Sequence, residues 1–144
     1  MDTSETWIDR QFQSAVGKYR ITSATNSGYN CIAFAAGSTA EWWSHFPGYK
    51  WPAPRSPLIG SLISVFQSLG FEERPSTDLS LDPDFEKVAL YAKGGLWKHA
   101  SRQLPDGKWT SKLGPDEDIE HDTPECFCGD FYGTIHCVMR KARK

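Results

Sequence analysis

The second half of the chain consists of short apolar segments separated by tight turn signals, and this pattern limits the fold more than any other feature. Four of these segments read as strands: 87–93, 97–104, 108–113 and 132–139. Pro105, Asp106 and Gly107, between the two middle segments, form a strong turn signal. Turns this short join antiparallel neighbours, so we predict an antiparallel meander.

The first half carries helix signals instead. Three segments place apolar residues at helical spacing: 4–16, 31–36 and 57–69. Asn30 precedes the middle segment as an N-cap, and Gly37 follows it. Helices followed by a meander predict an α+β fold. We expect a single domain over residues 1–144, with its core at about 4–140 and a solvated basic tail at 140–144.

Composition and charge exclude several classes of function. The net charge is −2, so the molecule carries no overall positive field for nucleic acid or for an acidic membrane. No stretch reaches the roughly 20 apolar residues that span a bilayer. The polar, acidic beginning of the sequence indicates a cytoplasmic protein with reduced cysteines. We expect a monomer whose partner is a protein or peptide, and delivery as an effector stays an open alternative.

Cys31 is the leading candidate for a chemical centre. It opens the predicted helix after Asn30, where unpaired N–H groups and the helix dipole favour a thiolate. A free cysteine has a pKa of about 8.5, and a neighbouring imidazole lowers it by forming an ion pair. The alternative is an inert thiol, because cysteine is common in buried apolar helices.

His99 is the best placed of the four histidines to pair with Cys31. It lies in a predicted strand of the hairpin, where a rigid element can aim it at the start of a helix. His45 falls in an aromatic loop, and His136 is expected on the solvated face of the last strand. The alternative is that His99 is an ordinary residue of the hairpin with no catalytic role.

These motifs carry a resemblance to known proteins. Residues 29–35 (YNCIAFA), 99–114 (HASRQLPDGKWTSKLG) and 119–121 (IEH) are similar to a small uncharacterised bacterial domain family of the papain-like cysteine hydrolase superfamily. The cell-wall amidase branch is nearest in size, and the resemblance spans roughly residues 29–140. It implies a papain-like fold in which N-terminal helices pack on the C-terminal meander. It also implies a nucleophile that opens a helix and a histidine on the following sheet.

The resemblance further implies a residue that orients the histidine and donors for an oxyanion. Ser111 lies on the strand after the histidine, although Asp, Asn or His is usual in that role. Gln103, on the histidine's own strand and face, is an alternative. Asn26 or Asn30 would donate to the oxyanion together with the backbone N–H of the nucleophile. Helix capping alone also explains Asn30.

The proline-rich aromatic segment 39–57 is predicted to be an ordered loop over the core. Trp42, Trp43 and Trp51 are candidates for the wall of a substrate groove beside the thiol. Aromatic clusters also build cores, so packing is the alternative for these side chains.

A rival constellation lies near the end of the chain. His121, Cys126, Cys128 and Cys137 are suitable ligands for tetrahedral zinc, but they lack the paired C-x₂-C spacing of strong zinc motifs. A disulfide and plain packing are the alternatives. We expect no metal and no cofactor, and zinc stays the alternative.

Two classes of function remain. The leading hypothesis is a thiol hydrolase or acyl transferase acting on an amide bond, with Cys31 as nucleophile and His99 as base and then acid. The second is a non-catalytic binding module that keeps a degenerate papain-like site, with or without zinc at its C-terminal cysteines.

Overall fold

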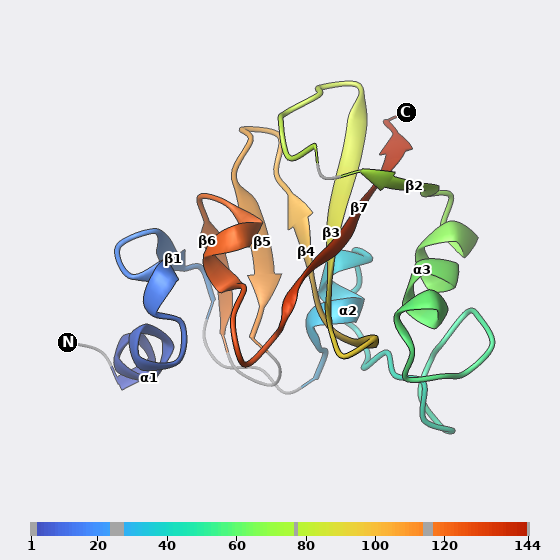
Figure 1. Ribbon diagram of the computed structural model, residues 1–144, viewed down its shortest axis with the longest axis horizontal. Coiled ribbons are helices and arrows are strands. Elements are labelled where there is room, and N and C mark those ends of the chain that lie inside the picture. Colours follow the sequence, from blue (N-terminus) through green and yellow to red (C-terminus); the bar gives the residue numbers. More distant parts are fainter. Residues whose placement is uncertain (1–2, 24–27, 77, 114–116, 144) are drawn as a thin grey trace.

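The computed structural model describes residues 3–23, 28–76, 78–113 and 117–143. Within these residues one antiparallel sheet has the strand order β1-β6-β5-β4-β3-β7-β2 (Figure 1). Its strands are β1 (Tyr19–Ile21), β2 (Glu72–Ser76), β3 (Phe85–Lys93), β4 (Leu96–Gln103), β5 (Trp109–Lys112), β6 (Asp118–His121) and β7 (Thr134–Ala142). The predicted hairpins β3–β4 and β4–β5 are present, and β6 continues them beside β5. The last predicted strand is placed differently: β7 returns to pair with β3 on the side away from β4, and β2 lies at the sheet edge beside β7.

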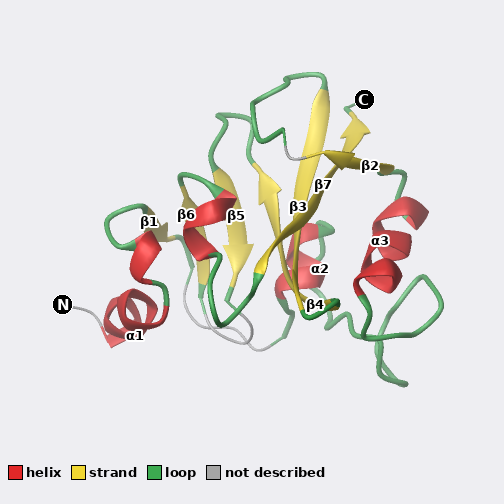
Figure 2. Cartoon of the chain, in the orientation of Figure 1, coloured by secondary structure: helices red, strands yellow, loops and turns green. Residues whose placement is uncertain are grey.

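In the described residues, three α-helices and two 3₁₀ turns surround the sheet (Figure 2). They are α1 (Thr3–Gln11), η1 (Gln13–Ala15), α2 (Cys31–Ala35), α3 (Ile59–Ser68) and η2 (Pro124–Phe127). The predicted α+β class is confirmed. No helix among the described residues has the length and apolar character needed to cross a bilayer.

The sheet separates two apolar clusters. The α2 face packs against α2, α3 and the aromatic loop, through residues that include Ile32, Leu62 and Leu90. The η2 face packs against α1, η1 and η2, through residues that include Ile8, Tyr91 and Phe127. Because the central strands are covered on both sides, most of their side chains are buried whichever way they point.

Three sequence predictions are corrected at the ends of elements. The first helix ends at Gln11 rather than continuing to residue 16, and a 3₁₀ turn follows it. Strand β6 occupies part of the acidic sequence 116–122, where a run of charged residues favours a solvated loop or short helical turn. The basic tail is largely strand, because β7 continues to Ala142, where Arg140 pairs with Glu72 at 3.1 Å.

Two β-bulges change which face a side chain takes. The pairing register shifts at Lys98 on β4 and at His136 on β7. Strict alternation would place Ile135 and Cys137 together, but the bulge puts Ile135 beside Tyr91 on the η2 face while Cys137 joins the α2 face.

Candidate functional site

Cys31 occupies the first turn of α2, as the sequence predicts. The Asn30 side chain caps this helix by accepting a hydrogen bond from the Ala33 N–H at 3.2 Å. The thiol is nevertheless buried, with 7% of the residue exposed. Burial raises the pKa of Cys31 to about 11, and this outweighs the opposing effects of nearby backbone groups and of Lys112. The thiol therefore stays protonated near neutral pH.

His99 lies on the other side of the sheet from Cys31. Ala100, the next residue, packs in the same cluster as Cys31, and successive side chains of a strand point to opposite faces. The His99 ring instead stacks on Tyr132 with centroids 4.0 Å apart and contacts Tyr91 at 5.0 Å. The predicted Cys31–His99 pair is thus corrected, because the sheet lies between the two side chains.

The His99 ring is fully buried, and neither nitrogen has a hydrogen-bond partner among the described residues. Burial lowers the pKa of His99 well below its ordinary value, with a smaller contribution from His121. The ring is therefore a neutral aromatic packing element.

Ser111 makes a close contact with a histidine, but that histidine is His121. The Ser111 Oγ lies 2.6 Å from His121 Nε2 and 3.1 Å from Ser101 Oγ. Ser101 in turn lies 3.0 Å from the Tyr91 hydroxyl, which donates to the Pro124 carbonyl. This chain of hydroxyl groups crosses four adjacent strands and ties η2 to the sheet.

The partners of His121 determine its tautomer. Its Nδ1 lies 2.8 Å from the Thr123 carbonyl, which can only accept, so Nδ1 carries the proton and Nε2 accepts from Ser111. A neutral imidazole beside a hydroxyl is the arrangement of a base and its nucleophile. Here Ser111 is fully buried, so the pair is a structural link.

We expect acid to destabilise the fold through His121. Burial lowers the pKa of His121 to about 4 from an ordinary 6.5. The stability it contributes is present above pH 6.5 and is lost as the pH falls toward 4, because only the unfolded state then binds a proton readily. Between pH 7 and about 4.5 its share of the unfolding free energy should fall by about 2–3 kcal/mol.

Urea unfolding of the wild type and of His121→Asn at both pH values measures that share. The exposed residue His136 offers a control, since His136→Asn should keep the acid sensitivity of the wild type. Equal losses of stability in the wild type and His121→Asn would contradict this account of the buried imidazole.

The supporting residues predicted from the sequence serve other purposes. The Asn30 amide donates to the Trp43 carbonyl at 2.7 Å, and its oxygen accepts from the Trp43 N–H, so it fastens the aromatic loop to α2. Gln103 shares the η2 face with His99 but donates to the Leu79 carbonyl at 3.0 Å. Asn26 lies outside the described residues. None of the described residues of this set orients His99.

The tryptophans predicted for a groove belong mainly to the core. Trp43 and Trp51 are buried in the cluster of the α2 face, and the Trp51 indole donates to Ser61 Oγ at 2.8 Å. Trp42 is half-buried. Packing, the alternative drawn from the sequence, explains Trp43 and Trp51.

The candidate zinc ligands are not brought together. Cys137 lies in the cluster of the α2 face, whereas Cys126 and Cys128 lie with the η2 face. Cys126 Sγ is 3.9 Å from His121 Nδ1 and 3.0 Å from the Thr123 carbonyl, to which it donates. In the described part of the chain no three His, Cys, Asp or Glu side chains form a metal-binding group, and none of the four cysteines there forms a disulfide.

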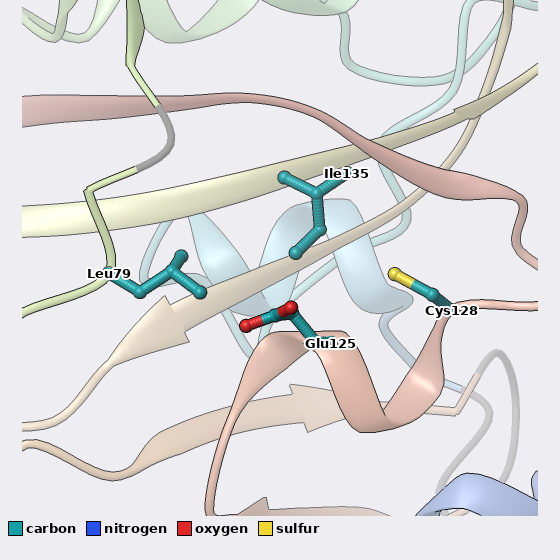
Figure 3. A pocket seen from close by; sticks show the side chains of 4 residues that line it. All are labelled: Leu79, Glu125, Cys128 and Ile135. Atoms are coloured by element: carbon teal, nitrogen blue, oxygen red, sulfur yellow. The ribbon is translucent and has the colours of Figure 1, made fainter.

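A pocket of about 470 Å³ opens beside η2. Leu79, Glu125, Cys128 and Ile135 line it and point toward one another (Figure 3). Its lining offers one carboxylate and one half-buried thiol, and burial raises the pKa of Cys128. A ligand site usually combines an apolar lining with several polar groups that converge on the ligand. Glu125 and Cys128, which are both acceptors when ionised, do not provide such a set, so the pocket indicates no defined ligand.

Sequence reasoning missed a buried charge pair next to Cys31. Lys112 is fully buried and its Nζ lies 3.6 Å from Asp118 Oδ1 and 4.4 Å from the centre of the Tyr29 ring. The Tyr29 hydroxyl donates to the other oxygen of Asp118. A lysine inside a predicted strand was the available signal, since such a side chain needs a partner when both faces of the sheet are covered.

The fold and the site define an α+β domain whose candidate nucleophiles, Cys31 and Ser111, are both buried. A family model described as "Domain of unknown function (DUF7689)" matches residues 20–140. The chain belongs to this family. No curated protein and no solved structure gives a significant match.

Proposed function

We propose that the chain is a non-catalytic interaction module for a protein or peptide partner, built on a papain-like frame with a degenerate Cys–His site. The observation that carries the proposal is the placement of Cys31 and His99 on opposite faces of one sheet. A thiol nucleophile needs a base within hydrogen-bond reach, and a loop movement cannot carry a side chain through a sheet.

The frame itself supports the papain-like comparison. Cys31 opens a helix that packs against the sheet at β4, and a nucleophile that opens a helix is what the resemblance implies. The thiol itself lies near the Ala100 backbone. What differs is the facing of β4: its alanine, not its histidine, meets the thiol. By a degenerate site we mean one that keeps the fold around the cysteine but has no histidine positioned to act as its base.

The hydroxyl–imidazole pair on the other face gives no substitute centre. Ser111 and His121 are 0% and 1% exposed, and Phe127 of η2 packs over the imidazole with ring centroids 4.9 Å apart. A substrate carbonyl must approach to about 3–3.5 Å of the nucleophile. The packing of η2 leaves no such approach.

Site-resolved alkylation tests the proposal. We expect iodoacetamide to modify Cys31 slowly, with a pH midpoint near 11, and to modify the half-buried Cys128 faster because it is more accessible. Peptide mass spectrometry after reaction over a pH series reads each cysteine separately. In urea the midpoint of Cys31 should return to about 8.5.

An activated nucleophile gives the opposite pattern. If Cys31 were the fastest of the four thiols with a midpoint below about 8, the site would be functional as a thiolate centre and the proposal would be wrong.

A further inference from the structure

The connection between α2 and α3 runs beside the β3–β4 turn (Figure 1), and both segments carry exposed apolar side chains. Phe46 is 60% exposed, Tyr49 47%, Leu58 56% and Leu96 37%. The two segments are joined, since Leu58 and Leu96 form an isolated bridge and the Trp97 N–H donates to the Pro57 carbonyl. We call this surface, formed by residues 41–58 and 94–98, the aromatic face.

The aromatic face is held rigidly although it contains little regular structure (Figure 2). The Arg55 guanidinium donates to the carbonyls of Ser44, Phe46 and Tyr49 at 2.7–3.1 Å. One cation therefore fixes the backbone that carries the two exposed rings. Exposed aromatic rings on a fixed loop lose little conformational entropy on binding, which is typical of a recognition surface.

The charge of the aromatic face favours an acidic partner. Residues 41–58 and 94–98 contain three cations, Lys50, Arg55 and Lys98, against one carboxylate, Glu41. Lys50 and Lys98 are both exposed, and the Lys50 ammonium lies 5.5 Å from the Trp43 ring. The whole chain has a net charge of −2, so this positive region is local.

A hydrogen-bond donor at this face lacks an acceptor. The indole nitrogen of the half-buried Trp97 has no hydrogen-bond partner among the described residues. Its ring stacks on Trp51 at 5.3 Å and meets the His45 ring edge-on. The nitrogen itself is buried, so a partner's backbone carbonyl accepts this N–H only once the Trp97 side chain has rotated toward the surface, and side-chain rotamer changes are common on binding.

These features distinguish a peptide from other ligands. Residues 41–58 and 94–98 contain no Asn, Asp or Gln and a single Glu, so they offer few of the side chains that bind neighbouring sugar hydroxyls. Lipid chains would cover the rings but would leave the indole N–H without an acceptor. An extended peptide has free carbonyl groups, and acidic side chains would match the lysines.

We propose that the aromatic face binds an extended acidic peptide of a partner protein, through Phe46 and Tyr49 as apolar contacts and Lys50 and Lys98 as charge contacts. The proposal rests on the proposed function and adds to it the surface and the class of partner. Because the surface lies outside the cluster around His99, binding leaves the η2 face unchanged.

A display library of random dodecapeptides selected on the full chain tests this proposal. We expect winners rich in Asp and Glu, and a synthetic winner labelled with fluorescein should bind Phe46→Ala/Tyr49→Ala and Lys50→Glu/Lys98→Glu about tenfold more weakly, by anisotropy. All four side chains are exposed, so both variants should keep the wild-type melting temperature.

Selection of basic or neutral peptides, winners that bind the two variants as well as the wild type, or no winners at all would overturn the proposal. So would cosedimentation with vesicles of phosphatidylcholine and phosphatidylserine in the absence of peptide binding. The loss of peptide binding in the two variants reports on this surface alone, and thiol alkylation reports on Cys31 alone. Slow alkylation without peptide binding therefore refutes only the partner, and rapid alkylation refutes the non-catalytic function.

Discussion

Replacement of Lys112 by methionine should lower the free energy of unfolding by about 3–5 kcal/mol, because it leaves a buried carboxylate without its cation. Methionine keeps the length and most of the volume of the lysine side chain. The side chain of Asp118 is only 9% exposed, and that of Lys112 is 0% exposed. The Tyr29 hydroxyl remains as a donor to Asp118, but a neutral group does not balance the charge.

Lys108 provides the matched control on the same hairpin arm. Its ammonium lies 3.7 Å from Glu120, but its side chain is 52% exposed, so Lys108→Met should change stability by less than about 1 kcal/mol. The double variant Lys112→Met/Asp118→Asn should recover part of the loss, since it removes the unpaired charge. Urea unfolding gives all three values. Similar small losses for Lys112→Met and Lys108→Met would show that the pair is not a buried one.

Replacement of Gly133 by alanine should be at least as damaging, with a loss of roughly 4 kcal/mol or more. A Cβ at this position would lie 2.1 Å from the Ala92 carbonyl oxygen and 2.7 Å from its carbon, and both are backbone atoms. Gly133 also closes a turn through paired hydrogen bonds with Gly129. Its neighbour Tyr132 stacks on His99, so displacement of this turn would uncover the buried imidazole.

Gly17 separates backbone strain from the steric clash. Its φ of +76° almost equals the +79° of Gly133, but nothing lies within 4 Å of its virtual Cβ. Gly17→Ala should therefore cost only the left-handed conformation, about 1–2 kcal/mol. If thermal or urea unfolding gave the same loss for both alanine variants, the close approach of Gly133 to β3 would be wrong.

Local signals in the sequence were sufficient for most of the secondary structure. Asn30 and Gly37 correctly bounded the short helix that carries Cys31, and the apolar face of residues 57–69 predicted α3. The turn at 105–107 correctly joined β4 to β5. These features depend on neighbouring residues, so one sequence contains the information.

The facing of His99 could not be derived in the same way. His99, Ala100 and Ser101 are all buried, because helices cover both faces of the sheet. Alternation shows that His99 and Ala100 face opposite ways, but burial then gives no sign of which one meets α2. Counting alternate residues from Trp97, which lies on the α2 face, also gives the wrong face for His99. The β-bulge at Lys98 adds one extra residue to β4 between them.

The charge pair beside Cys31 was missed for a related reason. A run of carboxylates at 116–122 suggests a solvated loop when it is considered alone. Asp118 is instead buried, because β6 pairs with β5 and sets it opposite Lys112. Only the pairing of two strands, a non-local event, neutralises the charge.

The central claim, that His99 has no influence on the Cys31 thiol, is tested most directly by the pH midpoint of Cys31 alkylation in the wild type and in His99→Phe. Phenylalanine can keep the stacking on Tyr132 while removing both unpaired ring nitrogens, so the variant should fold. We predict the same midpoint, near 11, in both proteins. A midpoint that is low in the wild type and rises by about one unit or more in His99→Phe would contradict the account, because it would show that the imidazole supports a thiolate.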